Sequence, residues 1–184
     1  MKAFVHTILT MLLCFTCILA DAQPAVRFNR LTKEDGLSSD VVYDLHQDRY
    51  GFLWIATHGG LDRYDGYRFR HFRYDPHDSN SISGNFVHCI KEDNNGILWL
   101  TNNNGLNSLD PRTGLIKRFA PSPANMPKDM GDILLVNDSI ILVMAISTVY
   151  SFNKRQQSFS EIRLPPMEYH SKLMNAKFIM GYKG

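Results

Sequence analysis

At 184 residues the chain is long enough for one domain, and its 44% hydrophobic and 21% charged residues are ordinary for a globular protein. The formal net charge of +2 and the scattered Lys and Arg residues exclude a surface built to follow nucleic-acid phosphates. Cys14 and Cys17 lie in the N-terminal apolar run, so Cys89 has no partner for an internal disulfide. We expect Cys89 to be a small buried hydrophobe in a strand.

The N-terminus is typical of a signal peptide, which we place at residues 1–22. Lys2 supplies a positive charge, and residues 8–20 form an apolar run too short to span a bilayer comfortably. The Ala-Asp-Ala sequence that ends at Ala22 is a cleavage site, so we predict an exported, periplasmic chain that begins at Gln23. Lipoprotein processing at Cys17 is the alternative, but that residue lacks the small residue that should precede it.

Residues 41–47 (VVYDLHQ) begin the organised part of the chain. Their alternation predicts a strand with Val41, Tyr43 and Leu45 on one strongly buried face. A turn follows, and then residues 52–57 (FLWIAT), which are almost continuously apolar and predict a strand covered on both faces.

A sixteen-residue pattern, residues 51–66 (GFLWIATHGGLDRYDG), returns as residues 96–110 (GILWLTNNNGLNSLD). Trp54 and Trp99 are 99 − 54 = 45 residues apart. Four short antiparallel strands in each unit of this length are typical of a β-propeller blade. We therefore predict an all-β fold, a partial propeller of about three blades.

The repeat divides the chain into segments. They are an N-terminal strand and the segment leading to the first blade (23–40), blade 1 (41–80), blade 2 (81–120), a degenerate blade 3 (131–162), and a linker with the start of a further blade (163–184). Blade 3 keeps its turn at Asp138 but lacks the tryptophan and the Gly-Leu step. Because an open set of blades leaves edges bare, we expect this chain not to be a complete, independently stable unit.

The positions that both copies keep are interpreted as scaffold. They are Asp48, Gly51, Trp54, Gly60 and Leu61, then Asp93, Gly96, Trp99, Gly105 and Leu106. The aspartates are expected to form turns, and the tryptophans to pack between neighbouring blades. Truncation of either tryptophan to Ala should cost about 3–5 kcal/mol.

The same residues carry a family resemblance. EDGLSS at residues 34–39, QDxxGxLWIxT at residues 47–57 and GLxxYDG at residues 60–66 resemble the two-component regulator propeller repeat. The resemblance implies the N-terminal part of a periplasmic sensor region from a hybrid two-component histidine kinase of the Bacteroidetes type. It implies an oligosaccharide or other small periplasmic ligand and a signal passed to a kinase not visible in this chain. Closure of the propeller ring would require further blades, supplied by missing chain or a second protomer.

Two other functions stay open at this point. The chain could be a free secreted propeller that binds or acts as a scaffold, or a propeller enzyme such as a polysaccharide lyase. The sequence shows no nucleophile elbow, P-loop or dinucleotide fingerprint, and its histidines do not have the spacing of metal ligands. We predict no catalytic residue, no cofactor and no metal. Exposed candidates for ligand binding, on or beside turns, are Tyr50, His58, Arg63 and Tyr67.

Overall fold

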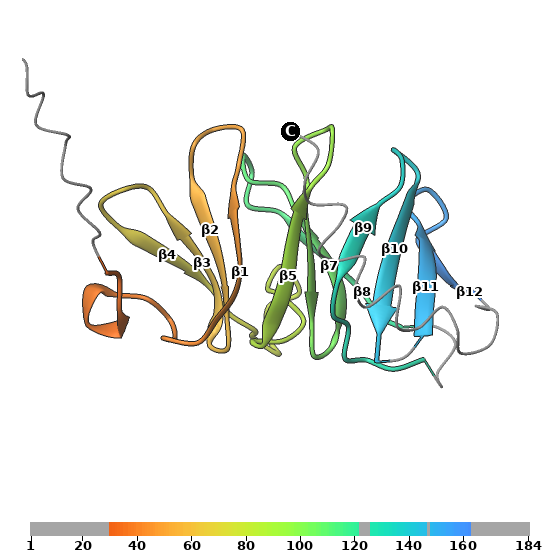
Figure 1. The fold of residues 1–184 in the computed structure, drawn as a ribbon, viewed down its shortest axis with the longest axis horizontal. Coiled ribbons are helices and arrows are strands. Elements are labelled where there is room, and N and C mark those ends of the chain that lie inside the picture. The colour runs from red at the N-terminus through yellow and green to blue at the C-terminus, as the bar shows by residue number, and fades with distance from the viewer. Residues whose placement is uncertain (1–29, 122–125, 147, 163–184) are drawn as a thin grey trace, which may run out of the picture. The chain divides into compact units, whose positions relative to one another are not determined.

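The computed structural model describes residues 30–121, 126–146 and 148–162, in which twelve strands form three four-stranded antiparallel sheets (Figure 1). The predicted all-β fold, with about three propeller blades, is confirmed. The predicted signal peptide and the linker after the third sheet lie outside the described residues. No helix in the described part is long and apolar enough to cross a membrane.

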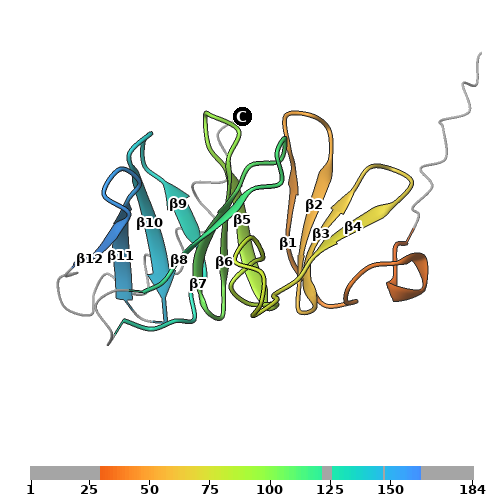
Figure 2. The ribbon, with the colours of Figure 1, turned by 180° about the vertical axis from the view of Figure 1, so that it is seen from behind.

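Each sheet is one blade, and its strands pair in chain order. Blade 1 consists of β1 (Val42–Gln47), β2 (Leu53–Thr57), β3 (Gly60–Tyr64) and β4 (Phe69–Phe72). Blade 2 consists of β5 (Val87–Glu92), β6 (Leu98–Asn102), β7 (Gly105–Leu109) and β8 (Ile116–Phe119). Blade 3 consists of β9 (Ile133–Leu135), β10 (Ile140–Ala145), β11 (Thr148–Asn153) and β12 (Ser158–Ile162). Figure 2 shows the other side of the same three sheets.

The apolar core lies between the blades. Trp54, fully buried, shares a cluster with Leu61 and Phe72 of its own blade and with Ile90 and Leu98 of blade 2. The next cluster joins blades 2 and 3 around a second tryptophan, described below. Since one sheet cannot cover its own apolar face, each interface stabilises two blades at once.

The second interface contains a group of three aromatic rings in contact. Trp99 lies 5.7 Å from Phe119 of blade 2 and 5.8 Å from Phe152 of blade 3, measured between ring centroids. Phe119 and Phe152 are themselves 4.8 Å apart. Blade 3 thus supplies aromatic surface to the interface although its own tryptophan is missing.

The prediction of a strongly buried face on residues 41–47 is wrong. Val41 is 51% exposed and Leu45 is 57% exposed. The strand is the innermost of blade 1, with β2 as its only sheet neighbour, and its register shifts between Val42 and Asp44. One of its contacts with blade 2 is a hydrogen bond of 2.9 Å that Asp44 Oδ2 accepts from the backbone N–H of Ile90. Alternation alone did not reveal which strand face has a partner.

The segment before β1 is held against blade 1. It contains a short 3₁₀ helix, Lys33–Asp35, followed by the buried Leu37. The backbone N–H of Ser38 donates to Asp62 Oδ2 over 2.7 Å, and its hydroxyl donates to Asp62 Oδ1 over 2.5 Å. His71 Nδ1 lies 2.7 Å from Asp62 Oδ1. The fully buried carboxylate of Asp62 therefore fixes this segment to the outer half of the sheet.

Candidate functional site

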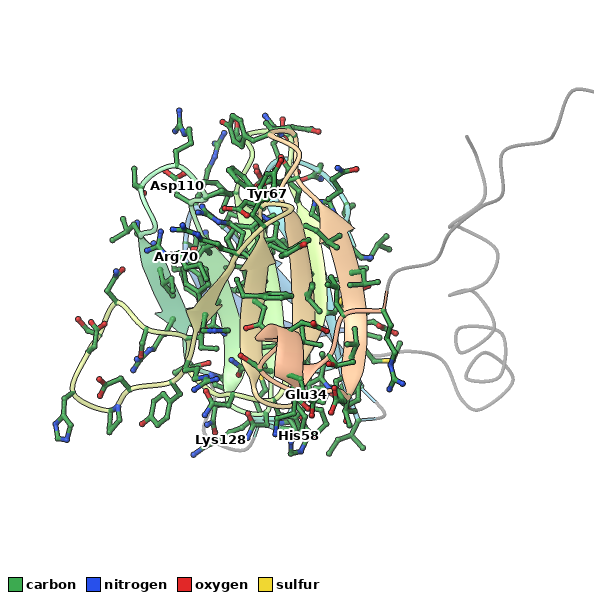
Figure 3. The ribbon with its side chains drawn as sticks, turned by 90° about the vertical axis from the view of Figure 1, so that its left-hand side faces the viewer. Glu34, His58, Tyr67, Arg70, Asp110 and Lys128 are labelled. Carbon is green, nitrogen blue, oxygen red and sulfur yellow. The ribbon has the colours of Figure 1, made fainter. Side chains whose placement is uncertain are left out.

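The four predicted ligand-binding candidates are not brought together. His58 lies in the β2–β3 turn, whereas Tyr50 and Tyr67 lie in the β1–β2 and β3–β4 turns, and Figure 3 shows His58 and Tyr67 at opposite ends of blade 1. Arg63 lies on β3, with its guanidinium carbon 4.4 Å from the ring centroid of Phe52. The four residues therefore do not form one site, and a site on this chain also needs residues that the sequence did not single out.

His58 belongs to a cluster of four rings, the aromatic cluster, that joins blades 1 and 2. Phe86 lies at its centre, with ring centroids 4.7 Å from Tyr43, 4.7 Å from His58 and 4.2 Å from His88. Tyr43 and His88 are 5.8 Å apart in an edge-on arrangement. Tyr43 and His58 are exposed, and the other two rings are partly buried. The cluster thus presents accessible aromatic surface beside the innermost strands.

Sequence reasoning missed Tyr43 and Phe86 because it assigned the first to a buried face and did not weigh the second. A signal was available, since Tyr43 and His88 occupy the same repeat position at an offset of 88 − 43 = 45 residues. Equivalent positions on neighbouring innermost strands lie close together in a propeller. Two aromatic side chains at that offset therefore predict a shared surface.

Polar groups surround the aromatic cluster. His88 Nε2 lies 2.9 Å from Asp129 Oδ1, in the segment that leads to β9. The backbone N–H of His58 donates to the Val41 carbonyl over 3.1 Å, and that of Asn103 donates to the Phe86 carbonyl over 3.2 Å. The β2–β3 and β6–β7 turns are thus fixed beside the rings. Apolar ring faces beside imidazole and carboxylate groups suit a ligand with both an apolar face and hydroxyl groups.

Within the described ranges, no group of three or more His, Cys, Asp and Glu side chains is arranged to hold a metal ion. Cys89 is buried, and desolvation raises the pKa of its thiol to about 12. The reactive thiolate form is therefore strongly disfavoured at neutral pH.

The repeated aspartates and tryptophans form one structural unit. Asp48 accepts hydrogen bonds from two backbone N–H groups of its own turn and from Trp54 Nε1, the last over 2.7 Å. Asp93 has the same arrangement with Trp99 Nε1 at 2.8 Å, and Lys154 Nζ adds a contact of 2.7 Å. Burial raises the pKa of Asp93, but the hydrogen bonds from Lys154 and Trp99 outweigh it, so the pKa lies below the ordinary value. The sequence predicted turns here but not the indole partner.

A further polar link joins blades 1 and 2 away from the aromatic cluster. Arg49 Nε donates to Glu92 Oε1 over 2.5 Å, and Arg49 Nη2 donates to the Asp93 carbonyl over 2.8 Å. His46 Nε2 lies 3.0 Å from Glu92 Oε2. Burial raises the pKa of Glu92, but hydrogen bonds from His46 and Arg49 outweigh it and hold that pKa below the ordinary value.

Comparison with known proteins identifies the repeats. Residues 36–59 and 81–104 match the family described as Two component regulator propeller. These two segments are two-component regulator propeller repeats. The predicted resemblance is confirmed.

Each propeller repeat spans the same part of a blade. The first runs from the segment before β1 into the β2–β3 turn, and the second covers the equivalent part of blade 2. All four members of the aromatic cluster lie inside the two repeats. β4 and β8, the outermost strands, lie outside them.

The propeller repeats also relate the chain to longer proteins. Over 56 residues the chain is 46% identical to Histidine kinase P4 of Formosa agariphila, an alignment that covers 30% of this chain and 4% of that protein. The chain thus spans a small part of that relative.

Two solved structures from B. thetaiotaomicron are similar. The extracellular domain of the hybrid two component system BT3049 is 20% identical, with a TM-score of 0.49, and the match covers 75% of this chain and 26% of that one. The corresponding domain of the hybrid two component system BT4673 is 21% identical, with a TM-score of 0.41, and the match covers 72% and 25%.

Proposed function

We propose that this chain is part of an exported, periplasmic propeller that binds an oligosaccharide and passes the signal to a histidine kinase. Two propeller repeats and 46% identity to part of a histidine kinase support a role in a two-component sensor. We assign the chain a binding role without catalysis, and we take its remaining partners to be further blades.

The aromatic cluster is the proposed ligand surface, and this observation carries the assignment. Tyr43 and Phe86, with ring centroids 4.7 Å apart, come from neighbouring blades. A sugar ring has an apolar face that stacks on an aromatic side chain and hydroxyl groups that require polar partners. His58 and the His88–Asp129 pair provide such partners beside the rings. A ligand across this surface would contact both blades and stabilise their association.

The test is a binding measurement with the full chain. Xylotetraose, cellotetraose, mannotetraose and arabinotetraose would be titrated calorimetrically against the wild type, Phe86→Ala and His58→Ala. We expect at least one of these sugars to bind the wild type and to bind each variant at least tenfold more weakly. Tyr50→Phe, in a turn outside the aromatic cluster, is the matched control and should bind as the wild type does.

Binding of none of these sugars would contradict the carbohydrate assignment. Binding that is unchanged in Phe86→Ala would remove the aromatic cluster as its location. The melting temperatures of the variants, measured without ligand, separate a lost contact from a lost fold.

A further inference from the structure

Two arginines lie opposite each other on the outer strands of blade 1. Arg63 of β3 and Arg70 of β4 are paired in the antiparallel register, so their side chains share one face of the sheet. On the other side of β3, Arg63 is paired with Trp54 of β2. Both arginines therefore lie on the same face of the sheet as Trp54, which is the face that packs against blade 2. In such a pair the Cβ atoms are about 4.5–5.5 Å apart. Two positive charges are thus held side by side.

Within residues 30–121, 126–146 and 148–162, no carboxylate pairs with either of these charges. Among the described residues, neither Arg63 nor Arg70 forms an ion pair or hydrogen bond through its guanidinium. The Arg63 guanidinium carbon instead lies 4.4 Å from the Phe52 ring centroid, and that of Arg70 lies 4.9 Å from the Phe72 ring centroid. Stacking occupies the flat face of a guanidinium and leaves its N–H edge free to donate.

The carboxylates of the neighbouring turns have partners of their own. Asp65 Oδ1 accepts from the backbone N–H groups of Tyr67 and Arg68, over 2.8 and 2.7 Å. Asp110 Oδ1 accepts from the backbone N–H of Arg112 over 2.9 Å. Both carboxylates therefore act as turn formers.

The arginine pair is absent from the equivalent place in blade 2. There Ser108 and Lys117 are paired, next to Trp99. Arg70 also lies close to blade 2, since a Cβ added to Gly114 of the β7–β8 turn would be 3.5 Å from Arg70 Nη2. The two guanidiniums therefore mark the outer rim of the interface between blades 1 and 2. Both arginines lie outside the segments that match the propeller repeat.

We propose that Arg63 and Arg70 bind an anionic group, a carboxylate or a sulfate, carried by an acidic oligosaccharide. This inference rests on the proposed carbohydrate-binding function and adds a contact for a charged group of the ligand, on the outer strands away from the aromatic cluster. Paired guanidiniums present planar sets of N–H donors that match the oxygens of either group. Tyr67, in the adjoining β3–β4 turn, has an exposed ring on the same blade as Arg70 (Figure 3).

The test is calorimetric titration of the full chain with tetragalacturonic acid, sulfated maltotetraose and neutral maltotetraose. We expect at least one acidic probe to bind more tightly than the neutral one, with an affinity that falls as salt is raised. Which acidic probe binds distinguishes a carboxylate from a sulfate. The variant Arg63→Gln/Arg70→Gln should bind that probe at least tenfold more weakly and lose most of the salt dependence. Lys117→Gln, which removes one positive charge at the equivalent place in blade 2, should bind like the wild type.

The single variant Arg70→Gln is the control for loss of the fold in the double variant. Arg70 is exposed, so its replacement should leave the melting temperature unchanged. We expect this single variant to bind the acidic probe at least threefold more weakly than the wild type does. Equal binding of acidic and neutral probes, or unaltered binding by the double variant, would overturn this inference and leave the proposed function standing. Binding of no saccharide, in this titration and in the one described under the proposed function, would overturn both. A polyglutamate peptide is titrated as a fourth probe, and binding of that peptide alone would replace the saccharide with an acidic protein segment.

Discussion

Trp99 Nε1 and Lys154 Nζ both donate to Asp93 Oδ2, over 2.8 and 2.7 Å. The tryptophan belongs to blade 2 and the lysine to the turn between β11 and β12 of blade 3. Lys154 Nζ also lies 5.1 Å from the Trp99 ring centroid. One buried carboxylate therefore links a turn, a core aromatic residue and the next blade.

Replacement of Lys154 by Met should loosen blade 3. The loss of a hydrogen bond from a charged donor should lower the free energy of unfolding by about 1.5–3 kcal/mol near pH 7. Because the pKa of Asp93 is lowered in the folded state, this contribution is present above the unfolded pKa of about 3.9 and is lost as pH falls through the folded value. The difference between wild type and variant, measured by urea unfolding, should shrink as pH falls below about 4. A difference that stays constant with pH would contradict this account.

Replacement of Trp54 by Phe separates the indole N–H from the ring. Phenylalanine fills much of the same space but leaves the buried Asp48 without one donor, which should cost about 1–3 kcal/mol. Trp54→Ala removes the ring as well and should cost about 3–5 kcal/mol. Urea unfolding measures both, with the exposed Tyr67→Phe as control. Equal losses for the two variants would show that the N–H bond carries all of the effect.

The period of 45 residues made the blades predictable, because a strand pattern that returns at a fixed spacing specifies a repeated sheet. It also located the buried Trp54 and Trp99. The aromatic cluster was harder to foresee, since Tyr43 and Phe86 meet only where neighbouring blades approach, and the pattern within one strand cannot report that contact. The same limit explains the exposed β1, whose alternation suggested a covered face.

Substitution of Gly60 tests why glycine recurs before leucine at the start of the third strand of blades 1 and 2. Its φ is +138°, and an added Cβ would lie 2.8 Å from the Phe72 carbonyl oxygen, too close for any real contact. Gly60→Ala should therefore lower the free energy of unfolding by more than the roughly 1–3 kcal/mol expected for backbone strain alone. Gly66→Ala is the matched control, because its φ is +97° and no atom lies within 4 Å of the added Cβ. Equal losses in the two variants, measured by urea unfolding, would show that the close approach at β4 has no cost.

The buried Asp62 should control the segment before β1. Its counterpart in blade 2 is Asn107, whose Oδ1 accepts a 2.9 Å hydrogen bond from the backbone N–H of Ser83. The hydrogen bond from Ser38 to Asp62 thus recurs in blade 2, with both partners moved by one repeat. Asp62→Ala removes the acceptor of the hydrogen bond that the Ser38 N–H donates. We expect faster hydrogen exchange at Ser38 and a free energy of unfolding lower by about 1–3 kcal/mol.

Hydrogen–deuterium exchange read by mass spectrometry distinguishes this local release from general instability. The peptide that covers residues 31–40 should exchange faster in Asp62→Ala, while the peptide that covers β10 and β11 should keep its protection. Asp65→Ala, which removes an exposed turn carboxylate nearby, should leave exchange at Ser38 unchanged. Uniformly faster exchange across all three blades would contradict a local role, because it would place Asp62 in the global stability of the fold.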